Sequence, residues 1–412
     1  MTASPTPPCR LCGAALTQTF VDLGVSPPCE SYLTADELDQ GETFYPLHVR
    51  VCSECLLVQL PAYLAAEDIF SHYAYFSSYS DSWVAHAERF VAGAVDRLGL
   101  TEGSFVVEVA SNDGYLLQHV VRRGMRALGV EPAANVAEAA VAKGVPTEVV
   151  FLGEETGRKI ADAHGAADLV VANNVFAHVP DIVDFARGLR ALVADPGRVS
   201  IEIPHLLRLI QGREYDTIYH EHYSYLSLLT TQRVLARAGL TVVDVEELPT
   251  HGGSLRTWSA PAESAGAPGP AVDRVLAAER AAGLHTLDGH MGFAGEVAAV
   301  RNDLVEFLIA RAREGARVVG YGAPGKGNTL LNHAGIRADL LRFTVDRNPF
   351  KHGKYLPGTH IPIHPVDEIA RARPDYVLIL PWNLRDEIAE QLAYVRDWGA
   401  RLVVPLPRLE VL

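Results

Sequence analysis

The chain has 412 residues, 48% hydrophobic and 21% charged, a composition typical of a folded protein with two or three domains. Fifty acidic residues against 36 basic ones give a formal net charge of −14, which disfavours a broad nucleic-acid-binding surface but not a small anionic ligand. No apolar run approaches the ~20 residues of a membrane span, and the first residues, MTASPTPPCR, lack a secretory-signal pattern. We therefore expect a cytoplasmic protein that binds neither nucleic acid nor a membrane.

All five cysteines lie within the first 55 residues. Four of them form two C-x-x-C pairs that can offer four thiolates to a tetrahedral Zn²⁺: Cys9, Cys12, Cys52 and Cys55. A segment this short has little core of its own, so we expect a structural zinc in a domain over residues 1–67. A metal-free set of thiols or a redox pair is the alternative. Cys29 lies outside both pairs and has no predicted function.

Residues 68–265 alternate apolar strands with helical stretches. Strands are predicted at 105–110, 126–132, 167–174 and 198–204, with helices such as 133–144 between them. This alternation predicts a doubly wound parallel sheet. Two later strands, 240–249 and 254–260, flank His251-Gly252-Gly253 and predict an antiparallel hairpin. A closing hairpin is typical of class I S-adenosylmethionine (SAM) methyltransferases, whereas an ordinary dinucleotide-binding sheet stays parallel.

The loop after the first of these strands reads EVASNDGY, residues 108–115. It lacks the G-x-G-x-x-G of dinucleotide-binding proteins, because Ala110 and Asn112 stand where two glycines would. SAM has a cationic amino-acid tail, which suits Glu108, and Glu131 is placed to accept both ribose hydroxyls. The alternative is that both are solvated acids at strand ends. The predicted cofactor residues are Glu108, Ala110, Asn112, Asp113, Gly114, Tyr115, Glu131, Pro132, Asn173 and Asn174.

Two groups of proton-handling side chains follow the later strands. His178, in NNVFAHVPD, should face the ligand crevice at the carboxyl ends of the strands unless its role is only structural. The stretch YDTIYHEHYSY, residues 215–225, gathers four tyrosines and two histidines after the fifth strand. Its HEH is not the H-E-x-x-H of zinc peptidases. Metal binding stays open, but a general base with tyrosines that stabilise an oxyanion is favoured.

After a linker rich in Pro, Gly and Ala at 262–272, residues 266–412 predict a second, smaller α/β (Rossmann-like) domain. Its GYGAPGKGNT imitates a P-loop, but Gly327 stands where Ser or Thr would bind Mg²⁺, which argues against an NTPase. A glycine-rich turn at a helix N-terminus can still hold a sugar-nucleotide pyrophosphate; a tight turn with a solvated lysine is the alternative. The predicted substrate residues are Gly322, Gly325, Lys326, Gly327, Asn328, Asp346, Arg347 and Lys351.

Six motifs, in this order, resemble those of the C-methyltransferases that act on nucleotide-linked deoxysugars. They are the paired CxxC knuckles, YxYFSSYSDSW, EVASNDGYLL, NNVFAHVPD, YDTIYHEHYSY and GYGAPGKGNTLL. The resemblance covers essentially the whole chain and is closest to the C-3 methyltransferase of the tetronitrose pathway. Members of this family use SAM to methylate dTDP-4-keto-deoxysugars in antibiotic biosynthesis, and they carry a zinc domain that matches the four paired cysteines.

The resemblance also implies a mechanism. A base removes the acidic C–H next to the ketone, and the enolate attacks the SAM methyl group. The family pattern places the base at His222, with Tyr219 and Glu221 beside it, and the division of labour between Tyr219 and His222 stays open. The expected reaction is methyl transfer to C-3 of a dTDP-linked 3-amino-4-keto-2,3,6-trideoxyhexose.

Three more residues match the family pattern outside that stretch. His178 matches a second active-site histidine that could hold the enolate oxygen. Tyr73 or Tyr75 matches a tyrosine that reaches the sugar. The second α/β domain is expected to help bind the nucleotide.

Other functions are alternatives to this methyl transfer. C-methylation at C-3 or C-5 of another dTDP-4-keto-6-deoxysugar is the nearest alternative. An NAD-dependent sugar-nucleotide oxidoreductase or epimerase would want the glycines that the first loop lacks, and an RNA methyltransferase would want a basic surface. A non-catalytic scaffold leaves residues 215–225 without a purpose. The oligomeric state stays open, and a monomer is compatible with the sequence.

Overall fold

The computed structural model describes residues 6–70 and 76–412, and the chain forms two compact units. The first unit comprises Met1–Thr17, Cys52–His205 and Tyr223–Thr286; the second comprises Gln18–Val51, Leu206–His222 and Leu287–Leu412. Each unit is therefore assembled from three separate stretches of sequence. The three consecutive domains expected from the sequence stay a prediction. Within the described ranges, no helix has the length and apolar character needed to cross a membrane.

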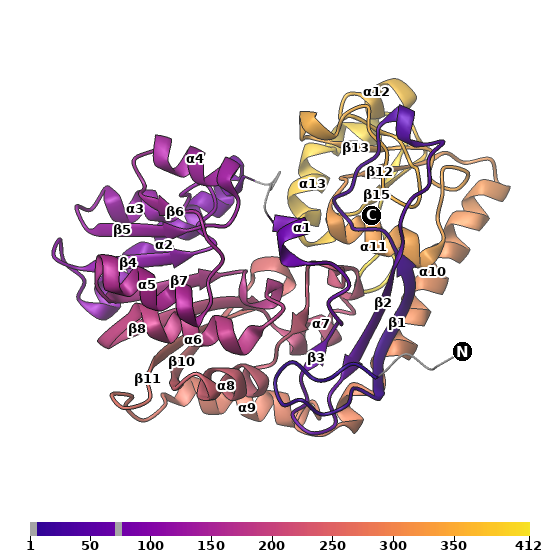
Figure 1. Ribbon diagram of the computed structural model, residues 1–412. Helices are drawn as coiled ribbons and strands as arrows, with labels where there is room; N and C mark the ends of the chain where they lie inside the picture. Colours follow the sequence, from indigo (N-terminus) through magenta and orange to yellow (C-terminus); the bar gives the residue numbers. More distant parts are fainter. Residues whose placement is uncertain (1–5, 71–75) are drawn as a thin grey trace. The chain divides into compact units, whose positions relative to one another are not determined.

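The first unit contains a seven-stranded sheet with the strand order β10-β11-β8-β7-β4-β5-β6 (Figure 1). β4 runs parallel to β5 and β7, and β7 runs parallel to β8, whereas β11 is antiparallel to both β8 and β10. A parallel sheet that closes on an antiparallel hairpin confirms the predicted class I methyltransferase fold. The strands are β4 (Phe105–Val109), β5 (Arg126–Val130), β6 (Thr147–Glu148), β7 (Ala167–Asn173), β8 (Val193–Pro204), β10 (Leu240–Leu248) and β11 (Ser254–Pro261).

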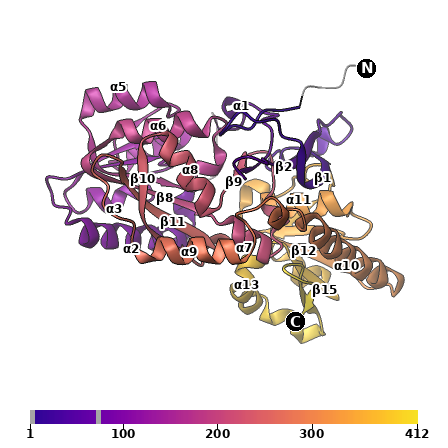
Figure 2. The same cartoon turned by 90° about the horizontal axis from the view of Figure 1, so that it is seen from below.

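Helices cover both faces of this sheet, as expected for strands that read as continuous apolar runs. One face packs against α2 (Asp81–Leu98), α3 (Leu117–Val121) and α4 (Ala134–Ala142). The other face packs against α5 (Glu154–His164), α6 (Ile182–Leu192), α8 (Leu228–Arg237) and α9 (Pro270–Ala281). Figure 2 shows α5 and α6 on the opposite side of the sheet from α2. All five residues of β4 are buried, which makes this strand the centre of the core.

The cysteine-bearing segments pack onto the same core. Cys9, Cys52 and Cys55 belong to the hydrophobic cluster that also contains the residues of α6 and α8. β3 (Val58–Gln59) pairs antiparallel with β9 (Ser224–Tyr225), and Arg233 of α8 donates a 2.7 Å hydrogen bond to the Cys55 carbonyl. A short helix, α1 (Ala66–Phe70), follows.

The second unit contains a six-stranded sheet with the order β14-β13-β12-β15-β16-β17, parallel except for the last strand. This confirms the predicted second α/β domain. Its strands are β12 (Val318–Tyr321), β13 (Thr344–Asp346), β14 (Ile363–Pro365), β15 (Tyr376–Ile379), β16 (Arg401–Val404) and β17 (Glu410–Val411). Its helices are α7 (Leu206–Gln211), α10 (Phe293–Arg313), α11 (Gly325–Ala334), α12 (Glu368–Ala372) and α13 (Arg385–Gln391).

An antiparallel pair, β1 (Gln18–Ser26) and β2 (Tyr45–Val51), also belongs to the second unit. Phe20 of β1 stacks on Phe293 of α10 at a ring-centroid distance of 4.8 Å. The loop between these strands carries Cys29, which is therefore separated from the four paired cysteines of the first unit.

Candidate functional site

The four paired cysteines form a cluster suited to one metal ion. Their sulfur atoms all lie within 4.8 Å of one another, and the pairs Cys9–Cys55 and Cys12–Cys52 are each 3.5 Å apart. Four thiolates bonded to one zinc at about 2.3 Å would sit roughly 3.8 Å apart, so the donor set fits Zn²⁺. Gln59 donates a 3.1 Å hydrogen bond to the Cys9 sulfur, which favours a thiolate ligand.

The loop after β4 has the backbone shape of a glycine-rich loop with only one glycine in it. Ala110, Asn112 and Gly114 all have left-handed backbones, with φ values of 55°, 50° and 75°. The amide of Ala110 donates to the Val130 carbonyl at 2.7 Å. The amide of Asn112 donates to the Glu131 carboxylate at 2.9 Å. These bonds fasten the loop to the end of β5 and hold a conformation that glycine would adopt more easily.

Two predicted cofactor acids are buried at the carboxyl ends of β4 and β5. Glu108 is 1% exposed and Glu131 is 5% exposed. Burial raises the pKa of Glu131, while its hydrogen bonds from the amides of Ala133 and Asn112 act in the opposite direction. Burial raises the pKa of Glu108 well above its ordinary value, and the nearby Tyr115 side chain opposes this shift. Apart from this contact with Tyr115, the two carboxylate oxygens of Glu108 have no hydrogen-bond partner within the described chain.

Further buried polar atoms gather at the same edge of the sheet. Asn174 has a left-handed backbone, with φ of 53°, where β7 ends. In the described ranges these atoms lack a hydrogen-bond partner: Ser111 Oγ, Asn173 Oδ1, Asn174 Nδ2 and Asn174 Oδ1. Buried polar groups are normally hydrogen-bonded, so a polar ligand here would satisfy them. A buried acid such as Glu108 suits an ammonium group, and Glu131 suits ribose hydroxyls, so these residues fit SAM.

Other predicted residues of the first unit lie near this edge. Tyr115 is buried, and its ring stacks on Trp83 at a centroid distance of 6.1 Å. Pro132 follows Glu131 directly. His178 ends a short 3₁₀ helix, Phe176–His178, that comes after β7, and it is half-buried. Tyr73 and Tyr75 fall outside the described residues.

Sequence reasoning missed three residues that fasten the cofactor loop. The amide of Ser77 donates to Asn112 Oδ1 at 2.9 Å, and the hydroxyl of Ser78 donates to Asp113. Lys143 Nζ lies 2.8 Å from the same Asp113 carboxylate. The signal was the Ser-Ser pair in YFSSYSD, two small hydrogen-bonding residues within a stretch that was interpreted only through its tyrosines.

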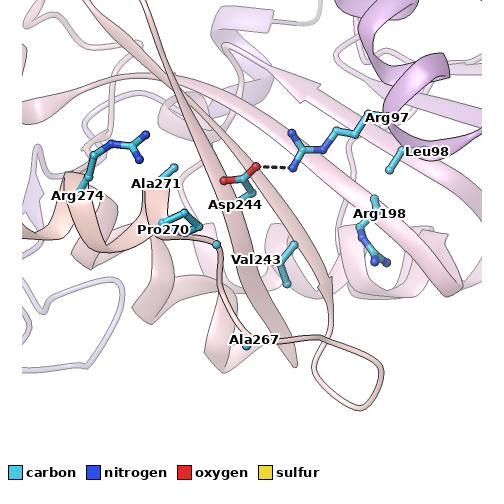
Figure 3. Close-up of a pocket in the computed structure, with 10 residues that line it drawn as sticks. Arg97, Leu98, Arg198, Val243, Asp244, Ala267, Pro270, Ala271 and Arg274 are labelled. Atoms are coloured by element: carbon cyan, nitrogen blue, oxygen red, sulfur yellow. Dashed lines mark hydrogen bonds and ion pairs between the residues drawn. The ribbon is translucent and has the colours of Figure 1, made fainter.

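The first unit also has a hollow of about 520 Å³, and it is not the cofactor site (Figure 3). It lies near the amino end of the paired part of β8, where Arg198 is paired with Leu169. Glu108 marks the opposite edge. Arg97 donates to Asp244 at 2.5 Å, and Arg198 donates to the carbonyls of residues 196 and 197. Two of the arginines of this hollow are therefore engaged within the protein.

In the second unit, His222 is held in one tautomer. Its Nδ1 lies 2.7 Å from the Thr217 carbonyl oxygen, which can only accept a hydrogen bond. The proton is therefore assigned to Nδ1, and Nε2 keeps the lone pair that a general base needs. The ring of Tyr219 packs against His222 at a centroid distance of 4.0 Å. Both side chains are half-buried, so they remain accessible to a reactant.

The neighbours of His222 differ in role. Burial and the charge of Glu30 raise the pKa of Glu221 to about 7, and the buried Cys29 thiol donates to Glu221 at 3.7 Å. His220 is 2% exposed, its Nε2 lies 3.3 Å from the Pro46 carbonyl, and burial lowers its pKa. His220 is thus a packing residue, and the described structure does not bring it together with His222 as a metal ligand.

The glycine-rich loop after β12 is tightly packed. Gly322 has φ of 88°, and a Cβ there would come within 2.6 Å of Pro381. A Cβ at Gly325 would come within 2.9 Å of the Cys29 sulfur, and one at Gly327 within 3.2 Å of Leu380. The loop therefore needs glycine for close packing whether or not it binds an anion.

The charged residues predicted around this loop are used in several ways. Lys326 Nζ donates to Asn383 at 2.9 Å, and Lys351 Nζ donates to the Ala323 carbonyl at 2.9 Å. Asp346 accepts hydrogen bonds from the amides of Ala323 and Asn348, at 2.7 and 2.8 Å. The Arg347 side chain is 71% exposed and lies 3.8 Å from Glu387.

Comparison with known proteins gives matches along most of the chain. Three family models match: "Putative zinc binding domain" at residues 9–70, "Methyltransferase domain" at 83–245 and "C-methyltransferase C-terminal domain" at 249–407. The C-methyltransferase NovU of Streptomyces niveus is 38% identical over 409 residues, which cover 99% of this chain and 97% of that protein.

Two weaker similarities each cover less than half of the chain. A ubiquinone biosynthesis O-methyltransferase of Methylobacterium sp. (strain 4-46) is 28% identical over 216 residues, 49% of this chain and 81% of that protein. The crystal structure of magnesium protoporphyrin IX methyltransferase from Synechocystis PCC 6803 with bound SAM is 16% identical, with a TM-score of 0.33 over 44% of this chain and 81% of that chain. The full-length match and the fold agree: the chain belongs to the family of SAM-dependent C-methyltransferases with an N-terminal zinc-binding domain.

Proposed function

We propose that the enzyme transfers the SAM methyl group to C-3 of a dTDP-linked 3-amino-4-keto-2,3,6-trideoxyhexose, in tetronitrose-type deoxysugar biosynthesis for an antibiotic. The observation that carries this proposal is the fixed tautomer of His222, whose Nδ1 lies 2.7 Å from the Thr217 carbonyl. A C-methyltransferase must turn an unreactive C–H into a carbon nucleophile. A C–H beside a ketone is acidic enough for a positioned imidazole to deprotonate.

In this proposal His222 Nε2 removes the proton next to the ketone of the sugar. Tyr219, packed against the imidazole, shares or assists this transfer. Glu221, with a pKa of about 7, lies next in the chain and exchanges the proton at neutral pH. SAM supplies the electrophilic methyl group that the resulting carbanion accepts.

The enolate oxygen needs a hydrogen-bond donor, because charge moves there as the C–H bond breaks. We assign this role to His178, at the carboxyl end of β7. Tyr73 or Tyr75 is proposed to contact the sugar; both lie outside the described residues. These assignments rest on the family pattern and on the position of His178 in the chain.

The glycine-rich loop of the second unit is proposed to receive the nucleotide. Backbone amides at the start of α11 can bind a pyrophosphate even where the loop side chains pack inward. The proposed substrate contacts are Gly322, Gly325, Lys326, Gly327, Asn328, Asp346, Arg347 and Lys351. A small-molecule partner of this kind is consistent with the chain's acidic net charge of −14, since the cations needed are local.

The test is mass spectrometry of dTDP-3-amino-4-keto-2,3,6-trideoxyhexose in D₂O, with and without SAM. We expect one added methyl group with SAM and one deuterium at C-3 without it. His222→Asn should lower both rates about 1,000-fold, because it removes the base. His220→Asn is the matched control, because it changes a buried histidine of the same segment that has no assigned role in the reaction, and it should keep both activities.

The outcomes separate the alternatives. If this sugar does not react but a 3-hydroxy 4-keto sugar gains a methyl group, the reaction class holds and the substrate is wrong. If C-5 is labelled, the regiochemistry is wrong. Methyl transfer to no keto sugar, from an enzyme that binds SAM, would overturn the proposal.

A further inference from the structure

The polar side chains at the start of α11 turn inward, toward the protein's own backbone. Thr329 is 2% exposed, and its hydroxyl donates a 2.9 Å hydrogen bond to the Ile218 carbonyl. Asn328 is 1% exposed, and its amide nitrogen donates a 2.5 Å hydrogen bond to the Cys29 carbonyl. Residues 328 and 329 follow the GAPGKG turn directly, so the motif that resembles a phosphate loop also binds the protein's own backbone.

Both acceptors lie beside groups that the proposed reaction uses. Ile218 stands between Thr217, whose carbonyl holds His222 Nδ1, and Tyr219, which packs against His222. The amide of His222 also donates to the Tyr219 carbonyl at 2.9 Å, so residues 217–222 form one hydrogen-bonded turn. A bond that fixes the Ile218 carbonyl therefore holds the peptide directly after the one whose carbonyl binds the imidazole.

Cys29 provides a second connection to the same turn. Its thiol is buried and donates to Glu221 Oε1 at 3.7 Å, while its carbonyl is held by Asn328. Gly325 completes the contact, because any Cβ at that position would press on the Cys29 sulfur. One turn of α11 is thus bonded to the Cys29 loop and to the turn that carries His222.

We propose that Thr329 is a positioning residue for His222, and that Asn328 positions Glu221 through Cys29. This inference rests on the proposed role of His222 as the base. A misplaced base loses rate steeply with distance, so the effect should appear in kcat rather than in the KM of either substrate.

The kinetic test compares Thr329→Val with Thr329→Ser in the full-length, zinc-loaded enzyme. Thr329→Val keeps the shape but removes the donor, and we expect kcat to fall about 30-fold with both KM values within about twofold. Thr329→Ser keeps the hydroxyl and should restore kcat to within about threefold of the wild type. A rise in the KM of the sugar nucleotide with unchanged kcat would overturn the proposal and make this turn a substrate-binding element.

A second readout does not depend on which sugar is the substrate. The ¹⁵N chemical shifts of histidine rings report the tautomer, and His222→Asn identifies the His222 signal among the 16 histidines. We expect the Nδ1–H form in the wild type and in Thr329→Ser, and a mixture of tautomers in Thr329→Val. An unchanged His222 spectrum in Thr329→Val would overturn the inference, even if the proposed sugar were methylated. If no sugar reacts but the spectrum changes, the substrate proposal fails and the positioning role stands.

Cys29→Ala supplies an independent variant should Thr329→Val fail to fold. It removes the thiol that faces Glu221 and leaves the carbonyl that Asn328 binds. We expect kcat to fall about fivefold and the pH dependence of kcat to shift, with Cys29→Ser closer to the wild type. Equal kcat and equal pH profiles in Cys29→Ala and the wild type would contradict the connection through Cys29.

Discussion

The two sheets present opposite kinds of loop after their first central strand. After β4, residues 110–114 contain one glycine, yet Ala110 and Asn112 adopt the left-handed backbones that glycines favour. After β12, residues 322–327 contain three glycines, and added side chains there would strike Pro381, Cys29 and Leu380. Among the described residues, Ser111 Oγ of the first loop has no hydrogen-bond partner, whereas the second loop is followed by Asn328 and Thr329, which bind the chain's own carbonyls.

This difference shows that glycine content alone does not identify a ligand loop. In the first unit the loop is shaped by hydrogen bonds that its amides donate to groups outside it, above all to the Glu131 carboxylate. In the second unit the glycines permit close packing of the loop against neighbouring side chains. A site for a cofactor is better recognised from unsatisfied buried groups than from a glycine count.

The largest effect should come from Glu131, because it accepts bonds from the amides of Asn112 and Ala133 and is the residue that we predict to bind the ribose of SAM. We expect Glu131→Gln to raise the Kd of SAM about 100-fold by calorimetry, since two bonds to a charged group are weakened. Glu148→Gln is the matched control, because Glu148 is exposed and its carboxylate pairs with His164 at 3.0 Å. An unchanged Kd in Glu131→Gln would remove this acid from the cofactor site.

The second loop should respond differently, because Lys326 lies near Asp216 and Glu214 and donates to Asn383. We expect Lys326→Met to lower the free energy of unfolding by about 3 kcal/mol in urea titrations, since it leaves buried acids without their cation. The Kd of SAM should stay the same. Arg347→Met removes an equal charge from an exposed side chain and should change stability by at most about 0.5 kcal/mol.

The opposite result for Lys326 would make the two loops more alike in function. Unchanged stability together with weaker binding of the sugar nucleotide would show that Lys326 serves the ligand rather than the chain. The two loops would then both be ligand loops, one shaped by acids and the other by glycines.

The third prediction concerns pH and Asp216, which accepts a 2.7 Å hydrogen bond from Trp382. Burial raises the pKa of Asp216 from 3.8 to about 6, despite the opposing effects of Lys326 and Trp382. A raised folded-state pKa means that the folded protein binds the proton more tightly, so stability is lost as pH rises from about 4 to about 6. Over that range, the wild type should lose about 2 kcal/mol relative to Asp216→Asn in urea titrations. A stability difference that stays constant with pH would contradict this sign.

Much of the fold could be predicted from the sequence, because apolar strands and turn residues mark it locally. The strands predicted at 105–110 and 126–132 are β4 and β5, and the Gly252-Gly253 turn does join an antiparallel hairpin. The cysteine cluster could also be predicted, because two C-x-x-C pairs that meet at one point supply four ligands for one metal ion. Each compact unit is assembled from three stretches of chain, which has no local signature and could not be predicted from the sequence.

Part of the candidate site could also be predicted, because local patterns in the sequence mark it. The sequence could mark residues 215–225 as a candidate reactive segment, but it could not tell His220, which is 2% exposed, from His222, which is half-buried. That distinction depends on backbone direction over a few residues. Likewise, the hydrogen bond from Thr329 to Ile218 joins positions 111 residues apart, and no periodic pattern in the sequence predicts it.

The smallest effect tests whether the first loop stores backbone strain. Ala110 has φ of 55°, a conformation that costs an alanine about 1 kcal/mol more than a glycine. We expect Ala110→Gly to raise the free energy of unfolding by about 1 kcal/mol, with the Kd of SAM within about twofold, because the bonds to Val130 and Glu131 still hold the loop. Ala139→Gly, inside α4, should instead lower stability by about 1 kcal/mol. If Ala110→Gly and Ala139→Gly lower the free energy of unfolding equally, Ala110 carries no backbone strain. The loop after β4 then differs from the glycine-rich loop after β12 in composition alone.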